Sequence, residues 1–224
     1  GASDGAPLLT SGYHELAADR NTVGLWHMNE ASGNVADGSG NGNTGVPTGT
    51  TVVAGKFGNG RSLNGTSSDF IDAGNGSSLS MGNGQITVEA WIKPAVTGTY
   101  QMILTKGQPG ISTNKGYRLR IESSNVVEFR VTGDTELAAV STNTITSGQW
   151  YHVVGVKDSA NIKLYVNGEI WANNTAPAGT TNNSVNLQIG RDSSSQWFFN
   201  GIIDEVRISN IARTPEEIKQ DAQR

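Results

Sequence analysis

Short runs in which apolar and polar residues alternate recur along most of this 224-residue chain. An alternation with period two puts apolar side chains on one face of a strand and polar ones on the other, so each run predicts a half-buried strand. Glycine, asparagine and serine separate the runs, and the pair Asn167-Gly168 indicates a two-residue hairpin turn. Strands of this kind favour an all-β fold in which two antiparallel sheets stack as a sandwich. The clearest runs cover residues 85–94, 116–122, 126–133, 150–158, 161–171, 185–191 and 201–209.

The two ends of the chain differ from the strand-rich middle. Residues 1–20 have no clear pattern, and we expect an N-terminal extension or a tail cut from a larger chain, followed by a single domain over 21–224. Near the other end, Thr214 followed by Pro215 and Glu217 predicts a short C-terminal helix that starts with a capping box. We therefore expect one monomeric module that belongs to a multidomain chain.

Composition excludes several classes of function. The chain has no cysteine, which rules out disulfides, cysteine-ligated zinc and a thiol nucleophile. Its formal net charge is −4, and no basic footprint indicates a nucleic-acid partner. No apolar run approaches the roughly 18 residues of a membrane-spanning helix, so we expect no membrane insertion. Ser/His/Asp triads, phosphate loops and histidine clusters are also missing as sequence patterns.

Five phrases, in this order along the chain, resemble the concanavalin A-like jelly roll in its laminin-G-like (LamG-type) bacterial form. They are GLWHMNEASGNVADGSGNGNTG (24–45), GKFGNGRSLNG (55–65), ITVEAWIKP (86–94), GQWYHVVGVKD with IKLYVNGE (148–169) and FNGIIDEVRISNIARTPEEI (199–218). The resemblance implies a jelly-roll sandwich of two curved antiparallel sheets, often with one structural calcium ion. Members are mostly carbohydrate-binding, lectin-like or adhesive modules of secreted or cell-surface proteins. Relatives with the same architecture are glycoside hydrolases or polysaccharide lyases, so the fold leaves the function open.

Asp204 is the unexpected residue of the last predicted strand. By parity it shares an apolar face with Ile202, Val206 and Ile208. An ionised carboxylate on such a face must be paired, hydrogen-bonded or bound to a metal ion. A hydrogen bond to a backbone turn at the end of the strand is one interpretation. Because no cationic partner is evident nearby, a metal ion is the interpretation that we favour.

The loop GNVADGSGNGNTG at 33–45 offers matching oxygen atoms. Asp37, Ser39 and Asn41 lie at alternate positions, as in the first half of a calcium-binding loop, but position 12 of that pattern falls on Thr48 and not on a glutamate. The alternative is a set of Asx turns, in which side-chain oxygens accept hydrogen bonds from their own backbone. Together with the resemblance, the pattern predicts a structural calcium ion held by Asp37 and Asp204, with weaker contributions from Glu30, Ser39, Asn41 and Asn43.

A glycan or polysaccharide ligand has one candidate place on the strands. If 86–94, 116–122 and 126–133 share a sheet, their polar faces carry a tryptophan, two glutamates and three arginines. A flat aromatic ring suits the C–H face of a sugar, and guanidinium groups suit hydroxyls or carboxylates. The alternatives are ordinary cross-strand ion pairs and a tryptophan that is merely covered by a loop. The candidate ligand-binding residues are Glu89, Trp91, Arg118, Arg120, Glu128 and Arg130.

Two loops offer further candidate places. Gln196, Trp197 and Phe198 lie in the polar segment SSSQWFFNG at 193–201, where exposed aromatic residues between strands often mark binding. The alternative is that Phe198 or Phe199 fills the end of the core. Tyr100 and Gln101, in a loop after Pro94, are a third and fainter candidate.

The two glutamates leave an enzyme open. Glycan hydrolysis needs two carboxylates that face one cleft, roughly 5–9 Å apart. Glu89 and Glu128 meet that need only if they face each other from neighbouring strands, and no strand carries the closely spaced acids of related hydrolases. We therefore expect a non-catalytic, calcium-stabilised carbohydrate-binding or adhesive module, secreted or at a cell surface. The alternatives are a glycoside hydrolase or polysaccharide lyase, and a protein-binding laminin-G-like adhesion module.

Overall fold

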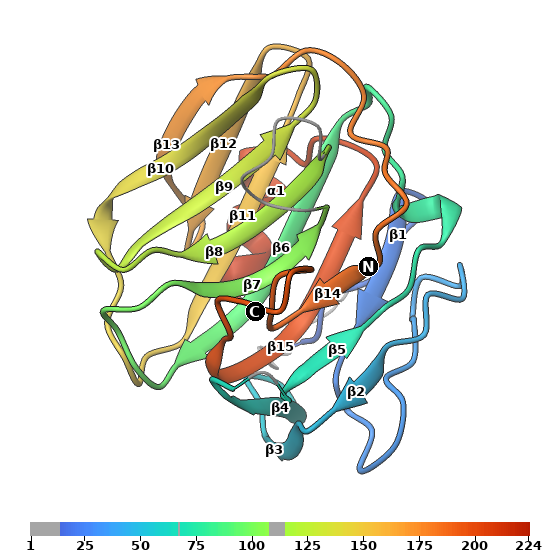
Figure 1. Cartoon of the computed structure of the whole chain (residues 1–224), viewed down its shortest axis with the longest axis vertical. Coiled ribbons are helices and arrows are strands. Elements are labelled where there is room, and N and C mark those ends of the chain that lie inside the picture. Colours follow the sequence, from blue (N-terminus) through green and yellow to red (C-terminus); the bar gives the residue numbers. More distant parts are fainter. Residues whose placement is uncertain (1–13, 67, 108–114) are drawn as a thin grey trace, which may run out of the picture.

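Two stacked antiparallel sheets make up the described part of the chain, residues 14–66, 68–107 and 115–224 of a computed structural model (Figure 1). The first sheet has eight strands, whose neighbours in order are β13 (Glu169–Thr175), β12 (Asn161–Val166), β11 (Tyr151–Lys157), β6 (Ile86–Pro94), β15 (Asn200–Ser209), β4 (Asn59–Asn64) and β3 (Thr51–Ala54), with β1 (Thr22–Trp26) also paired to β15. The second sheet has seven, namely β10 (Glu136–Thr144), β9 (Val126–Thr132), β8 (Gly116–Ile121), β7 (Gln101–Lys106), β14 (Leu187–Ile189), β5 (Phe70–Asp72) and β2 (Val46–Thr48). The predicted jelly-roll sandwich is confirmed.

The core lies between the two sheets and is built by the alternation seen in the sequence. The first sheet contributes Ile86, Val88 and Ile92 of β6 to this core, and the second sheet contributes Leu119 and Phe129. All five side chains are fully buried. Each buried side chain of this size contributes about 2 kcal/mol relative to leaving it in water. The intervening residues of these strands therefore point to the outer faces of the sandwich.

The helix α1 (Pro215–Ala222) covers the outer face of the first sheet. Its predicted capping box is present, because Thr214 and Glu217 exchange both hydrogen bonds. Ile218 packs on Val154 and Tyr165, which stand on that outer face. None of the helices in the described residues is long and apolar enough to cross a membrane.

The end of the predicted N-terminal extension packs on the same face. Leu16 is 2% exposed, and its N–H donates to the carboxylate of Glu205 at 2.6 Å. The carbonyl of Ala17 accepts a hydrogen bond from Arg207 at 2.9 Å. Residues 14–20 thus belong to the folded domain, whereas residues 1–13 of the predicted extension lie outside the described residues.

A β-bulge interrupts the pairing of β15 with β6. Just after Asp204, β15 carries two residues where β6 carries one, and Glu205 has a φ of 49°. The extra residue reverses the parity of the strand, so that Val206 and Ile208 enter the core while Asp204 lies on the outer face beside Trp91. The prediction that Asp204 shares a face with Val206 and Ile208 is therefore wrong, because alternation does not continue across a bulge.

Candidate functional site

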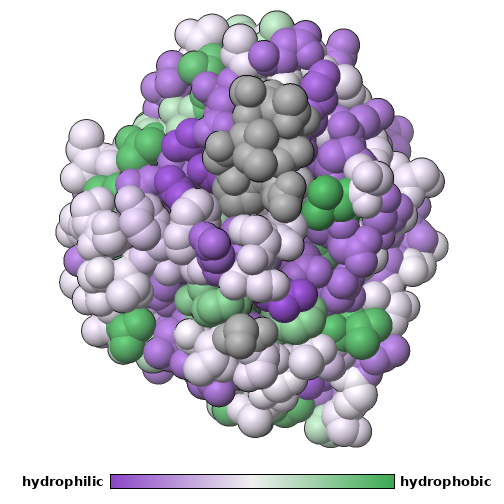
Figure 2. All heavy atoms as spheres, in the orientation of Figure 1, coloured by the Kyte–Doolittle hydropathy of each residue, from purple (hydrophilic) through white to green (hydrophobic). Residues whose placement is uncertain are grey.

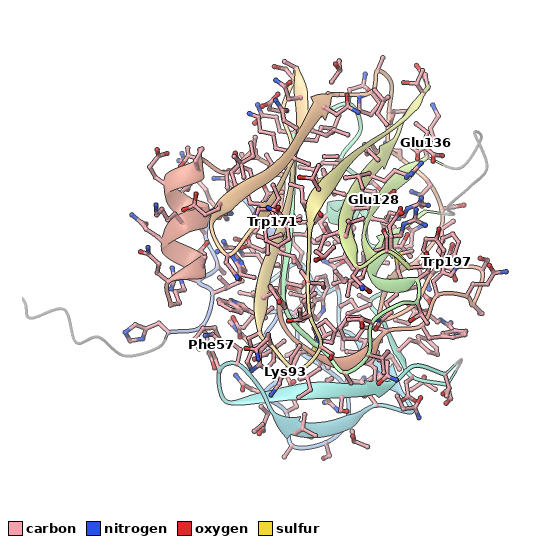
Figure 3. All side chains as sticks on the ribbon, turned by 90° about the vertical axis from the view of Figure 1, so that its left-hand side faces the viewer. Phe57, Lys93, Glu128, Glu136, Trp171 and Trp197 are labelled. Atoms are coloured by element: carbon pink, nitrogen blue, oxygen red, sulfur yellow. The ribbon has the colours of Figure 1, made fainter. Side chains whose placement is uncertain are left out.

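The strand with Glu89 and Trp91 does not share a sheet with the arginines. Both residues lie on β6 of the first sheet, whereas β8 and β9 belong to the second. The prediction of one shared face is wrong, because period-two alternation does not reveal which strands are neighbours. Figure 3 shows the consequence: Glu128 and Trp197 lie on the side of the sandwich away from α1.

Glu89 is buried in an ion-pair network beneath α1. Its two carboxylate oxygens bind Arg207 at 2.7 Å and the ring of His152 at 3.0 Å, and Arg207 in turn binds Asp221 of the helix. Burial alone raises the pKa of Glu89, but the charge of Arg207 and the bond to His152 hold it down at about 2. The side chain is 0% exposed, so it fastens the helix to the sheet and has no access to a ligand.

Trp91 is covered by the turn that precedes β4. Its ring stacks on His152 with 5.1 Å between centroids and meets the edge of Phe57 at 5.9 Å. The ammonium of Lys56 lies 4.3 Å from the Trp91 ring centroid. With 3% exposure Trp91 offers no face to a sugar, as the loop-covered alternative expected.

The arginines of the second sheet converge on one carboxylate. Glu128 accepts hydrogen bonds from Arg118 at 3.1 Å, Arg120 at 3.1 Å and Arg130 at 2.6 Å. Arg130 also binds Glu136, which lies beside Glu128 (Figure 3). Burial raises the pKa of Glu128, but the bond from Arg130 and the charges of the other two arginines hold it at about 2. The three arginines are thus all bound to Glu128 and form a rigid surface, called the arginine floor below.

An aromatic pair stands on the arginine floor. The rings of Tyr100 and Trp197 lie 5.6 Å apart at an angle of 35°. The guanidinium of Arg120 lies 5.1 Å from the Tyr100 ring centroid and 5.0 Å from the Trp197 ring centroid, and that of Arg118 lies 5.8 Å from the latter. Such cation–π contacts hold both rings in place from below. Tyr100 is 40% exposed and Trp197 is half-buried, so both keep accessible ring surface.

The loop before β15 holds Trp197 in a constrained position. Its carbonyl accepts a hydrogen bond from the N–H of Met102 at 2.6 Å, which docks the loop on β7. The carboxylate of Asp192 accepts the N–H of Gln196. Trp197 has a φ of 51°, a left-handed conformation that costs a non-glycine residue about 1 kcal/mol or more. The fold therefore holds this ring in place at a conformational cost, while Gln196 is exposed beside it.

A surface cavity of about 510 Å³ opens next to the aromatic pair. Its size falls in the usual range of small-molecule sites, roughly 300–1,000 Å³. Apart from the two rings, its lining residues are Gly65, Val96, Gly98, Thr99, Ser123, Phe198 and Asn200. Sequence reasoning identified the segment 193–201 with Trp197 and Phe198 and ranked Tyr100 third. It missed Gly65, Thr99 and Ser123, which come from three separate loops that only the fold brings together. The surrounding face is largely hydrophilic (Figure 2).

The carboxylate of Asp37, a predicted metal ligand, accepts hydrogen bonds that hold its loop in shape. One carboxylate oxygen accepts the N–H groups of Leu25 at 3.0 Å and Ser39 at 2.9 Å. The other accepts the N–H of Asn43 at 2.9 Å and its side-chain amide at 3.1 Å. In addition, Asn41 donates to the hydroxyl of Ser39 at 3.1 Å. This arrangement corresponds to the Asx-turn alternative, because N–H donors occupy the lone pairs that a calcium ion would need.

The carboxylate of Asp204 likewise accepts backbone hydrogen bonds, but from other segments of the chain than those that bind Asp37. Its carboxylate accepts the N–H groups of Lys56 at 2.8 Å, Phe57 at 3.0 Å and Glu205 at 2.8 Å. Burial raises the pKa of Asp204 to about 7. Glu30 accepts the N–H of Ala36 at 2.9 Å. Asp37 and Asp204, as arranged, do not fit a shared calcium shell, and the calcium ion stays a prediction.

One other group among the described residues could hold a cation. Glu15, His27 and Glu205 bring three ligand atoms within 4.8 Å of one another. His27 Nδ1 lies 2.7 Å from the carboxylate of Glu205, and that hydrogen bond raises the pKa of His27. A protonated imidazole would offset one of the two glutamate charges, and a metal ion would have to displace that proton.

A family model described as the Concanavalin A-like lectin/glucanases superfamily matches residues 64–219, well over half of the chain. The chain belongs to this superfamily. The concanavalin A-like resemblance read from the sequence is thereby confirmed. A search of curated protein sequences gives no match.

Solved structures share the concanavalin A-like fold of this chain at low identity. The binding domain of Paraclostridial Mosquitocidal Protein 1 has a TM-score of 0.74 and 16% identity, and the botulinum neurotoxin serotype G binding domain has 0.70 and 13%, each over 90% of this chain. The chain spans only about half of those two domains, 52% and 50% of their lengths. Domain 4 of AbnA, a GH43 extracellular arabinanase from Geobacillus stearothermophilus in complex with arabinotriose, has a TM-score of 0.71 and 23% identity over 90% of this chain and 98% of its own.

The fold of this concanavalin A-like domain separates the two glutamates that were considered as a catalytic pair. Glu89 lies on the first sheet and Glu128 on the second, so they do not face one cleft. Each is ion-paired, with a pKa of about 2. A general acid must hold a proton near neutral pH, and neither glutamate meets that requirement.

Proposed function

We propose that this chain is a non-catalytic carbohydrate-binding module whose site is the cavity beside Tyr100 and Trp197. The observation that carries the proposal is the pair of partly exposed rings 5.6 Å apart, braced by Arg120 at the edge of a cavity of about 510 Å³. A rigid aromatic ring stacks on the C–H face of a sugar at little entropic cost, because its rotamer is already set.

The polar lining supplies hydrogen bonds for the hydroxyls of such a sugar. Thr99, Ser123 and Asn200 offer two hydroxyls and an amide around the aromatic pair. The three arginines beneath share Glu128, and Arg120 and Arg130 also pair with Glu122 and Glu136, so three carboxylates balance the three guanidinium groups. A neutral sugar, held by ring stacking and hydroxyl contacts, therefore suits this cavity best.

The relatives support this proposal by analogy. Domain 4 of the arabinanase was solved with arabinotriose, and the two toxin structures are binding domains. By the same analogy we propose that the module acts outside the cell, as a monomeric part of a larger protein. Arabinan and its oligosaccharides are accordingly the first glycans to test.

Affinity electrophoresis against a panel of soluble polysaccharides tests the proposal. We expect retardation by at least one neutral glycan, and Trp197→Ala should abolish it without changing the melting midpoint by more than a few degrees. Trp171→Ala, which removes a half-buried tryptophan from the first sheet, is the matched control and should still bind. Release of reducing ends from a bound glycan would favour the hydrolase alternative, and capture of a protein with no glycan bound would favour the adhesion alternative.

A further inference from the structure

A second cavity, of about 470 Å³, lies beside the loop at residues 33–45, called the opening loop below. It is enclosed by the start of β1, the 3-10 helix η1 (Ser77–Leu79), the segment after η1 and Asn210 at the end of β15. It has no lining residue in common with the cavity at Tyr100 and Trp197. Any ligand here is therefore bound by different residues from those of the proposed function.

The polar side chains of this cavity are available for a ligand. Arg20 is exposed and makes no hydrogen bond or ion pair with the other described residues. The hydroxyls of Ser77 and Ser80 and the side-chain amide of Asn210 are likewise without partners in the part of the chain that the structure describes. In contrast, Arg118 and its neighbours on the second sheet all bind Glu128.

The charge of this cavity is not compensated. No aspartate or glutamate is among the described residues that line it, so no carboxylate of the cavity pairs with Arg20. A free guanidinium presents a planar fork of donors that matches a carboxylate. The chain as a whole has a formal net charge of −4, so this locally cationic polar cavity stands out against an acidic background.

The opening loop builds one wall of the cavity and holds it in shape. Asn43 donates to the hydroxyl of Ser78 at 3.0 Å and to Asp37 at 3.1 Å, which ties the loop to η1. Asn41, beside them, reaches the carbonyl of Thr22 at 3.5 Å and lines the cavity. Met81 adds an apolar patch that suits the C–H face of a ring.

We propose that this cavity is a second binding site, which takes one acidic sugar residue. The carboxylate of a uronic or sialic acid pairs with Arg20, and its hydroxyls meet Ser77, Ser80 and Asn210. The hydroxyl and amide groups explain why the ligand is a sugar, and the uncompensated guanidinium explains why it carries a carboxylate.

Backbone NMR of the labelled whole chain tests this site directly. The probes are the methyl glycosides of glucuronic, galacturonic and N-acetylneuraminic acid, each compared with its neutral methyl ester. We expect at least one acid to shift the amide signals of residues 77–85 and Asn41. Its affinity should fall about tenfold or more on esterification or in Arg20→Gln, as expected for the loss of a charged hydrogen bond.

Two control variants show whether the loss of affinity is specific to this cavity. Lys219→Gln removes the same charge from an exposed pair with Glu169 and should leave the acid bound as tightly. Trp197→Ala removes the proposed neutral-sugar site and should also leave it unchanged. The proposal is overturned if none of the three acids shifts these signals, if the esters bind equally well, or if Arg20→Gln has no effect.

Discussion

The guanidinium of Arg120 lies 5.0 Å from the ring centroid of Trp197, while its Nη2 donates to Glu128 at 3.1 Å. One side chain thus joins a buried ion-pair network to an accessible aromatic ring. Because Arg120 is held by the sheet, it also restricts the position of the Trp197 ring. The site is therefore preorganised before a ligand binds.

Arg120→Lys should weaken sugar binding about tenfold, because an ammonium has no planar face to support two rings. Arg130→Lys is the matched control, since Arg130 also binds Glu128 but contacts neither ring of the pair. Both variants should lower the melting midpoint to a similar extent. Isothermal titration calorimetry with the bound glycan measures the difference, and an equal loss of affinity in both would contradict a positioning role for Arg120.

Glu128→Gln should destabilise the fold by about 3 kcal/mol, because removing one partner leaves buried charges uncompensated. Three arginines lose their shared carboxylate in this variant. Glu136→Gln is the control, since Glu136 binds Arg130 at a more exposed position and should cost about 1 kcal/mol or less. Urea unfolding measures both, and equal costs would count against a central role for Glu128.

Stability should fall steeply in acid, between about pH 4.5 and pH 2. Glu89 and Glu128 have a pKa of about 2 in the folded protein against an ordinary value of 4.5. A depressed pKa contributes stability that is present above 4.5 and lost as pH falls through 2, about 3 kcal/mol for each group. Asp204, with a pKa of about 7 against 3.8, acts oppositely and favours the fold as pH falls from 7 to 3.8.

Urea unfolding over this pH range checks the sign of the effect. Glu128→Gln should make the fall in stability between pH 4.5 and pH 2 less steep, because it removes one of the carboxylates whose pKa is depressed. A wild-type free energy of unfolding that stays constant from pH 4.5 to pH 2 would refute the assigned ion pairs.

Asp37 should stabilise the opening loop through its hydrogen bonds. Asp37→Ala removes an acceptor of four hydrogen bonds and should cost about 2–4 kcal/mol. Melting of the wild type with a chelator, and then with calcium restored, tests the structural calcium ion predicted from the sequence, and an unchanged midpoint would contradict that ion. Asp134→Ala, at an exposed pair with Lys115, is the control and should cost little. A midpoint that drops with chelator and recovers with calcium would instead support an ion, for which Glu15, His27 and Glu205 offer a place.

Local patterns predicted the strands, the capping box at Thr214 and the fold class, because each depends on neighbouring residues along the chain. The errors have non-local causes. β6 joined the other sheet because alternation says nothing about strand order, and Asp204 changed face because of a bulge with φ of 49° at Glu205. Trp197 was identifiable as an aromatic residue in a polar loop, whereas its contact with Tyr100 depends on tertiary packing.

The indole N–H signals of the five tryptophans provide the most direct test of the sugar site proposed at Trp197. The signal that disappears in Trp197→Ala identifies Trp197. On titration with arabinan oligosaccharides and the other neutral glycans of the panel, we expect this signal to shift in a saturable manner, while those of the buried Trp26 and Trp91 stay in place. A saturable glycan interaction that leaves the Trp197 signal unmoved, or no interaction with any glycan of the panel, would contradict the assignment of the sugar site to this ring.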